Sequence, residues 1–451
     1  MEAILFRKCL GLNDARAFGT QTLIADPRNK EAGNAELIDC LNITTTPDGR
    51  VEKIAPLVTV LTHTAPVTGL SAGKRFIYQD TINTLEWDGT TSATIGAVLT
   101  GPVAHTSLDV RVASATKVYK SPVAGAALTE ALLGDISNIP PGPTPFYSQP
   151  PFSQAFRYNG ILYGINAASP KFLQYSRYAH NDVWAIGDDY LRHTLPVKNS
   201  GQIPGVIIAT HDGGVTLHRG SNPEDFEHAS APCPVIHNTL YSGFINKVLE
   251  DGHVFLCNDG VYFVGPDGKL VNLTVDQTDY LDALNNSYYC VTVKDGKYLA
   301  FGDLCCLEYD FKTKTLLKRS TQGVTGACTW NGRTYLSAGS AILTLGTEID
   351  TALSCSMTFP FSNLGTPGKK SLDCIYFTGT ASAGMNITVT DQTGAGWTRE
   401  VSDELVNVSD HRIKLPDGFL GNHVSFKFDC TSGAFRMEEV RVVLNASKRS
   451  R

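Results

Sequence analysis

The sequence is poor in charged residues, since Asp, Glu, Lys and Arg together make up only 18% of its 451 residues. The formal net charge is −6, and the only concentrated basic run is Lys448-Arg449-Ser450-Arg451 at the end. Proteins that grip nucleic acid need a basic face that displaces counterions from the phosphates. The composition therefore argues against such a face, whereas a weakly acidic wall would let a DNA duplex slide past without being held.

Long apolar runs are absent as well. No segment approaches the roughly 18 consecutive apolar residues that a membrane-spanning helix needs. The first residues, Met1 to Lys8, lack the basic region and apolar stretch of a secretory signal. We expect no membrane insertion, and a soluble protein that is made in a cytosol.

Motifs for catalysis and metal binding are also missing. The 11 cysteines form no CxxC pair, which excludes zinc ribbons and thioredoxin-like centres. Several lie within apolar runs, so we interpret them as free thiols buried as small hydrophobes. No G-x-S-x-G elbow, Walker loop or HExxH sequence occurs. The sequence thus predicts no enzyme, no cofactor, and no catalytic or metal-binding residues.

A few polar residues still merit inspection. Adjacent carboxylates on a strand point to opposite faces, so they make poor acid/base pairs. Such neighbours occur at Asp188-Asp189, Glu224-Asp225 and Glu438-Glu439. The 11 histidines show no clustering in sequence, although His211 and His218 flank a hairpin turn and could face each other. We interpret them as a structural pair rather than a metal site.

Glycine and proline are plentiful, with 41 and 22 residues, while long Ala/Glu/Lys/Leu stretches are missing. This balance is typical of many short strands joined by tight turns. The middle of the chain repeats a polar turn, an apolar-aromatic strand, a second turn and a second strand. Successive units are separated by roughly 40 residues. Their leading glycines are Gly160, Gly205, Gly252, Gly296 and Gly332, with an earlier unit at Gly73 and a degenerate one at Val110 to Tyr119.

Asn-Gly and Asp-Gly pairs between apolar alternations predict hairpins, because both turn residues need positive φ. About seven units of this length predict a β-propeller, in which each blade has four strands. The same spacings would also suit six or eight blades. A propeller often closes its ring with a strand from the other end of the repeat, and either Arg50 to Ile54 or Leu57 to Leu61 could supply it.

The fold class is therefore all-β, with a propeller followed by a C-terminal β-sandwich. We predict an N-terminal arm over 1–50, the propeller over 51–350, and the sandwich over 351–451, where short alternating strands persist after the repeat stops. A Pro-rich insertion at about 138–152 forms either a surface loop or an arm that lies on a neighbouring subunit. Deleting 351–451 is expected to leave a soluble propeller that fails to assemble.

Both ends of the chain carry a further pattern. The N-terminal part contains Gly11-Leu12-Asn13-Asp14, then Glu36 to Ile43, then Pro47-Asp48-Gly49-Arg50-Val51. The C-terminal part contains Ser362 to Lys370, Ile375-Tyr376-Phe377, Gly421 to Phe426 and Met437-Glu438-Glu439-Val440. Together these segments resemble tail proteins of tailed bacteriophages. The nearest group is the propeller-containing nozzle or hub proteins of short-tailed phages, also called DNA-stabilisation proteins, although Ile54-Ala55-Pro56 stands where the usual Arg-Pro-Gly follows the first strand.

The resemblance implies a virion protein that is assembled in the bacterial cytoplasm. It implies a homo-oligomeric ring, typically sixfold, stacked below portal and adaptor proteins and linked to tail fibres or tailspikes. DNA would pass through its lumen without specific binding, so the lumen is expected to lack a continuous Lys/Arg stripe.

Two other functions remain open. The first is a propeller at the tail tip or baseplate that binds a fibre, a receptor or a carbohydrate, with Tyr175, Trp184, Tyr190 and Trp397 as candidates for stacking on sugars. The second is a propeller glycosidase or lyase, for which the sequence offers no carboxylate pair.

Overall fold

The computed structural model describes residues 2–6, 8–12, 34–99, 102–106, 109–134, 137, 146–178, 180–185, 190–234, 237, 239–274, 286–347, 351–362, 364, 369–415 and 420–446. Regular structure in these ranges consists of β-strands and one short 3-10 helix, η1 (Pro223–Asp225). Across the same ranges, no helix has the length and apolar character needed to cross a membrane. The all-β prediction is confirmed.

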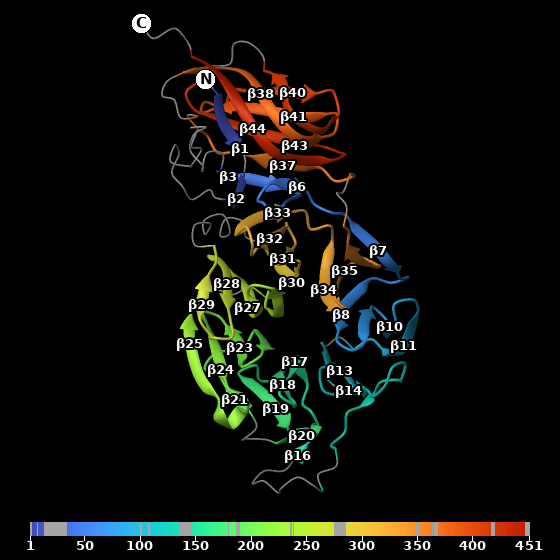
Figure 1. The fold of residues 1–451 in the computed structure, drawn as a ribbon. Coiled ribbons are helices and arrows are strands. Elements are labelled where there is room, and N and C mark those ends of the chain that lie inside the picture. The colour runs from blue at the N-terminus through green and yellow to red at the C-terminus, as the bar shows by residue number, and fades with distance from the viewer. Residues whose placement is uncertain are drawn as a thin grey trace.

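Seven antiparallel sheets form a ring, the β-propeller (Figure 1). We number them as blades in chain order and give their strands from the axis outward. Blade 1 contains β8 (Val67–Ala72), β9 (Phe76–Asp80), β10 (Asn83–Trp87) and β11 (Ser92–Ala97). Blade 2 contains β12 (Val103–His105), β13 (Val110–Ala113), β14 (Val118–Ser121) and β15 (Thr129–Glu130). Blade 3 contains β17 (Phe152–Tyr158), β18 (Ile161–Asn166), β19 (Phe172–Arg177) and β20 (His180–Ala185), with β16 (Phe146–Tyr147) on β20 and β21 (Tyr190–Arg192) on β19.

The remaining blades follow the same order. Blade 4 contains β22 (Asn199–Ile203), β23 (Val206–His211), β24 (Gly214–Arg219) and β25 (Glu227–Pro232). Blade 5 contains β26 (Tyr241–Asn246), β27 (Glu250–Cys257), β28 (Gly260–Val264) and β29 (Leu270–Asn272). Blade 6 contains β30 (Tyr288–Lys294), β31 (Lys297–Gly302), β32 (Cys306–Asp310) and β33 (Thr315–Arg319). Blade 7 contains β34 (Val324–Trp330), β35 (Arg333–Ala338), β36 (Ala341–Leu345) and, from the other end of the repeat, β7 (Leu57–Thr62).

The hairpin turns follow from the local sequence. Between β17 and β18, Asn159 and Gly160 have φ values of 47° and 85°. Between β34 and β35, Asn331 and Gly332 have φ values of 48° and 73°. Two consecutive positive φ values match the right-handed twist of the flanking strands, and Asn and Gly adopt them at low cost.

Strand β7 closes the ring. It pairs antiparallel with β36, with Leu57 opposite Leu345 and Leu61 opposite Ile342. Leu61 packs into the apolar layer between blades 7 and 1, and Leu57 packs into the layer between blades 6 and 7. Of the two closing strands considered from sequence, Leu57 to Leu61 is therefore the one that is used.

Two further sheets form what we call the two-sheet domain, which lies beside blade 6 (Figure 1). One sheet contains β5 (Ile43–Thr45), β6 (Val51–Lys53), β44 (Phe435–Ala446), β38 (Lys370–Ala381) and β41 (Leu405–Lys414), with β1 (Glu2–Phe6) on β44 and β42 (Leu420–Gly421) on β38. The other contains β4 (Asp39–Leu41), β37 (Cys355–Thr358), β43 (Val424–Cys430), β39 (Met385–Asp391) and β40 (Gly396–Val401). A separate parallel pair joins β2 (Lys8–Leu12) to β3 (Asn34–Leu37).

The predicted N-terminal arm over 1–50 instead contributes β1, β4 and β5 to the sheets of this domain, while β2 and β3 pair with each other. Strand β4 completes the edge of β37, with Cys40 opposite Met357, and β1 pairs with β44. The side chains of Cys40, Ile43 and Leu37 are fully buried. These strands are too short to give an alternating pattern in sequence. They become strands because they pair with the open edges of the C-terminal sheets.

One hydrophobic core joins the two-sheet domain to blades 5 and 6. On β39 burial alternates strictly, so that Met385, Ile387 and Val389 point into the core. The same cluster continues through Leu316 and Leu317 of blade 6. Each such buried side chain stabilises the fold by about 1.5–3 kcal/mol. The two parts of the chain therefore share a core.

Candidate functional site

The innermost strands, one per blade, surround the axis of the ring. In blades 1, 3, 6 and 7 the register of the innermost strand shifts at its second residue, which is left opposite no partner. These residues are Thr68, Ser153, Tyr289 and Thr325, and all are exposed. A β-bulge re-aims a side chain away from the regular pleat. The same place in these blades thus presents a hydroxyl group, which hydrogen-bonds but does not titrate near neutral pH.

This recurrence was not predicted from sequence. A signal was available only in Thr68-Gly69 and Thr325-Gly326, because Ser153 and Tyr289 are followed by Gln154 and Cys290.

Charge around the axis is sparse. Within the described innermost strands, Arg157 and Lys294 are the only Asp, Glu, Lys or Arg residues. His105 is half-buried and bonds to the Ser71 hydroxyl at 3.0 Å. Burial, aided by the nearby charge of Arg75, lowers the pKa of His105 to about 4, so it is neutral at pH 7. These strands contribute no carboxylate for acid/base chemistry.

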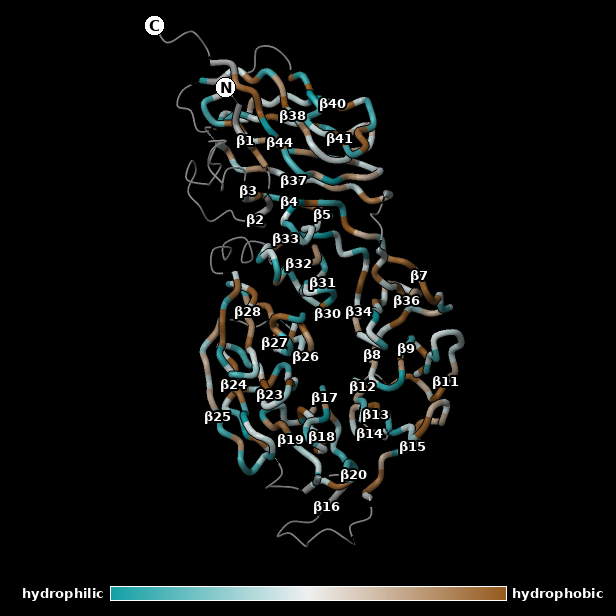
Figure 2. The backbone as a smooth tube through the Cα atoms, viewed as in Figure 1, coloured by the Kyte–Doolittle hydropathy of each residue, from teal (hydrophilic) through white to brown (hydrophobic). Residues whose placement is uncertain are grey.

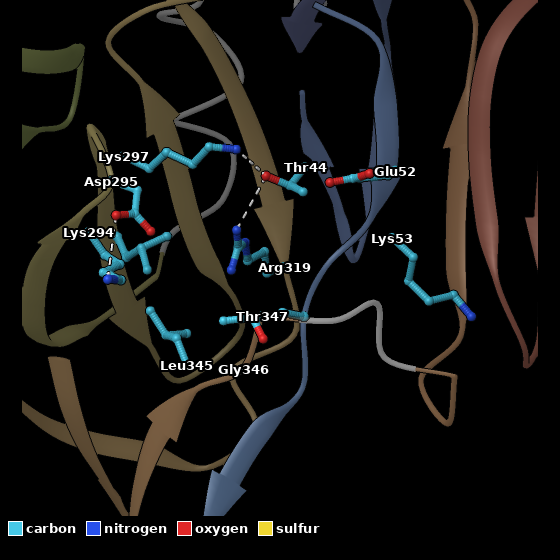
Figure 3. A pocket seen from close by; sticks show the side chains of 12 residues that line it. Thr44, Glu52, Lys53, Lys294, Asp295, Lys297, Arg319, Leu345, Gly346 and Thr347 are labelled. Atoms are coloured by element: carbon cyan, nitrogen blue, oxygen red, sulfur yellow. Dashed lines mark hydrogen bonds and ion pairs between the residues drawn. The ribbon is translucent and has the colours of Figure 1, made fainter. Parts of the chain in front are cut away.

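A small cavity of about 180 Å³ lies where blade 6 meets the two-sheet domain (Figure 3). It is lined by Thr44, Glu52, Lys53, Ala55, Lys294, Asp295, Lys297, Leu299, Arg319, Leu345, Gly346 and Thr347. Figure 3 shows the side chains of Lys297 and Arg319 converging on Thr44, while Lys53 points away. The ammonium group of Lys53 instead donates to the carbonyls of Leu353 and Gly433 at 2.7 and 2.6 Å.

The charges behind this cavity satisfy one another. Lys297 Nζ donates to the Thr45 carbonyl at 2.7 Å and lies 3.1 Å from Glu308 Oε1. Glu308 also pairs with Arg319 and accepts from the Thr44 hydroxyl at 2.6 Å. Burial lowers the pKa of Lys297 to about 8, against the opposing effect of the Asp310 carboxylate. The network joins blade 6 to β5, so we interpret it as a structural joint.

Four of the 11 histidines lie close together in space, contrary to their scatter in sequence. His218 on β24 lies directly opposite His228 on β25, and their Nδ1 atoms are 2.7 Å apart. The ring of His193, which follows β21, lies 5.2 Å from that of His218 and 4.9 Å from that of His211. His211 does not pair with His218 across the hairpin, because its partner there is Gly214.

The surroundings of these histidines favour their neutral forms. His218 and His193 are almost fully buried, and the ring of His218 lies beside that of Phe226. Burial, together with the neighbouring imidazoles, lowers the pKa of His218 to about 3 and that of His193 to about 4. In the part of the chain that the structure describes, no group of three or more His, Cys, Asp or Glu side chains is arranged to hold a metal ion.

The other polar candidates are dispersed. Glu224 and Asp225 lie exposed on η1. Glu438 pairs with Arg50 at 2.6 Å, whereas its neighbour Glu439 pairs with Arg441 at 3.3 Å, so the adjacent carboxylates serve different partners. Asp188-Asp189, residues 138–145 of the Pro-rich insertion and the basic end 448–451 lie outside the described residues.

The candidate aromatic residues do not form one platform. Trp184 is buried in blade 3, and its indole Nε1 donates to the Asn181 carbonyl at 2.9 Å. Tyr190 packs edge-on against Phe172, and Trp397 packs on the core of the two-sheet domain. Exposed aromatics occur elsewhere, at Tyr178, Phe244 and Tyr289.

No family model and no curated protein matches the chain. Among solved structures, YCF48 bound to D1 peptide is similar over 65% of this chain and 97% of its own, with 11% identity and a TM-score of 0.41. The extracellular domain of a two component system protein from B. thetaiotaomicron matches over 95% of this chain and 69% of its own, with 9% identity and a TM-score of 0.45. The WD40 domain of Neurospora crassa Pan2 matches over 63% and 90%, with 9% identity and a TM-score of 0.39. Likenesses at this level carry no inference about activity or partners.

Proposed function

We propose that the protein is a structural component of a phage tail, a nozzle or hub ring that conducts and retains the genome and links to other tail proteins. The role is architectural, not enzymatic. We further propose that the ring is homo-oligomeric, with sixfold symmetry, and contacts adaptor or portal-side proteins and fibres or tailspikes.

One observation carries the proposal. Parts of the N-terminal and C-terminal segments that resemble phage tail proteins lie far apart in sequence but meet in one sheet of the two-sheet domain. Val51 lies opposite Met437, and the Arg50 guanidinium pairs with the Glu438 carboxylate at 2.6 Å. The segments that carry the resemblance are thus parts of one structural unit, as expected if that unit is inherited whole.

Two further features suit this role. The sparse charge of the innermost strands and the net charge of −6 disfavour tight phosphate binding. Blade 6 and the two-sheet domain share one hydrophobic core, which resists bending between them. This rigidity suits a protein that forms the wall of a ring.

The test is mass measurement and electron imaging of virions from the phage that encodes the chain. We expect a ring of this protein within the tail. A chain that stays monomeric and is never found in virions would refute the proposal. A lumen with a continuous basic stripe would refute only the inference that DNA slides through the ring without being held.

A second function, binding of a carbohydrate or receptor, is favoured by one feature. A cavity of about 530 Å³ opens beside the turns of blades 5 to 7, lined in part by Tyr241, Phe244 and Thr329. Phe244 is 57% exposed, so its ring is available for stacking. Glycan-array binding that is lost in Phe244→Ala but kept in Tyr178→Ala would support this function, and a blank array would count against it.

A further inference from the structure

The outermost strand of blade 7 has an unusual composition. Strand β7 reads Leu-Val-Thr-Val-Leu-Thr and contains no charged residue, glycine or proline. Within the described residues its only strand partner is β36, so among these residues its outer edge has no strand partner. Figure 2 shows this strand as predominantly apolar. A free, apolar edge of this length is a template for another strand.

The outermost strands of other blades carry features that discourage pairing. Strands β15 and β29 have only two and three residues. Strand β25 begins with Glu227 and ends with Pro232, which lacks a backbone donor. Strand β11 contains Gly96. On β7 the only such feature is one bulge, where Val60 is skipped between Thr59 and Leu61.

The exposed part of β7 is self-complementary. Val58, Thr59 and Val60 face solvent, with Val58 45% and Val60 39% exposed. Read in either direction the run is Val-Thr-Val. In an antiparallel pair centred on Thr59, Val58 of each copy lies opposite Val60 of the other, and the two threonines face each other. Pairs of β-branched residues and Thr-Thr pairs both favour adjacent strands.

The charges around β7 also permit such a contact. From Ile54 to Gly73 the chain has no Asp, Glu, Lys or Arg. A two-fold axis brings each residue near a symmetry-related copy of its own surroundings, so like charges would repel. The segment that contains β7 carries no such charge, which favours a second copy of this chain over a partner selected by charge.

We propose that β7 is a docking strand for β7 of a second copy, through antiparallel pairing about a two-fold axis at Thr59. The contact extends blade 7 of each copy into a sheet shared by both. It is independent of the proposed tail function, because a two-fold contact does not by itself build a cyclic ring.

The test is sedimentation of the full chain over a range of concentrations. We expect a reversible dimer whose dissociation constant rises by about tenfold or more in Val58→Lys, since two lysines then enter the contact. The matched control is Val271→Lys, on the outermost strand of blade 5 and 38% exposed, which should leave the dimer unchanged.

The register is tested by rescue. In the double variant V58K/V60E each introduced lysine lies opposite an introduced glutamate of the other copy, so the dimer should return. In V58K/V60K it should not. A wild-type chain that is monomeric at every concentration would overturn the proposal, as would equal effects of V58K and V271K, or a folded V58K/V60E that stays monomeric. Each of these outcomes leaves the tail function to be judged by virion imaging alone.

Discussion

Acidification should destabilise the protein through its buried histidines, and His218 is the most direct case. Its folded-state pKa of about 3 lies below the ordinary value of 6.5 because burial and the adjacent imidazoles disfavour a positive charge. The unfolded chain therefore binds more protons as soon as the pH falls below about 6.5. Stability is retained above that pH and is lost progressively as the pH falls toward the folded-state pKa.

The magnitude follows from the two pKa values. Between about pH 7 and about pH 5, His218 alone should lower the free energy of unfolding by about 2 kcal/mol. His193, with a folded-state pKa of about 4, should contribute a similar loss over that interval. The 2.7 Å contact between the Nδ1 atoms of His218 and His228 adds to this loss of stability, because the two facing atoms cannot both carry a proton.

The assay is urea unfolding at a series of pH values. We expect His218→Gln to lose about 2 kcal/mol less stability than the wild type between about pH 7 and about pH 5, because glutamine does not titrate. His180→Gln, an exposed site on β20, is the control and should follow the wild type. Hydrogen exchange should locate the loss in blades 3 and 4. A wild-type stability that does not fall with pH, or an unchanged dependence in His218→Gln, would refute the reasoning.

Three further outcomes are expected. Lys297→Met should lower the free energy of unfolding by about 2–5 kcal/mol, because it removes a cation from beside the buried carboxylates of Glu308 and Asp310. Lys294→Met breaks a solvent-exposed pair with Asp295 and should cost about 0–1 kcal/mol. Urea titration compares the two variants. Gly332→Ala should cost about 1 kcal/mol by the same measurement, because φ is 73° and a Cβ there meets no neighbour, so the whole effect is backbone strain. Deleting 351–451 should give an aggregating chain rather than the soluble propeller expected from sequence, because it removes the partners of β4 and uncovers the core shared with blade 6; size-exclusion chromatography decides between them.

Much of the propeller could be predicted because its determinants are local. A turn such as Asn331-Gly332 encodes positive φ values in two adjacent residues, and the apolar alternation on either side encodes the hairpin. Leu57 to Leu61 was one of two candidates for the closing strand, since both are short segments with β-branched residues before the first blade. Only packing decided between them: Val51 pairs with Met437 in the two-sheet domain, and Leu57 pairs with Leu345 in blade 7.

What the sequence by itself determined is therefore the all-β class, the blade repeat and the absence of familiar catalytic motifs, all of which depend on residues close together along the chain. Only the tertiary structure decided the rest. It paired β1 and β4 with C-terminal strands and brought the rings of His193, His211 and His218 together. It also left β7 without a strand partner on its outer edge among the described residues. These features depend on contacts between segments distant in sequence, and such contacts form where burial of apolar surface outweighs the conformational entropy lost in ordering them.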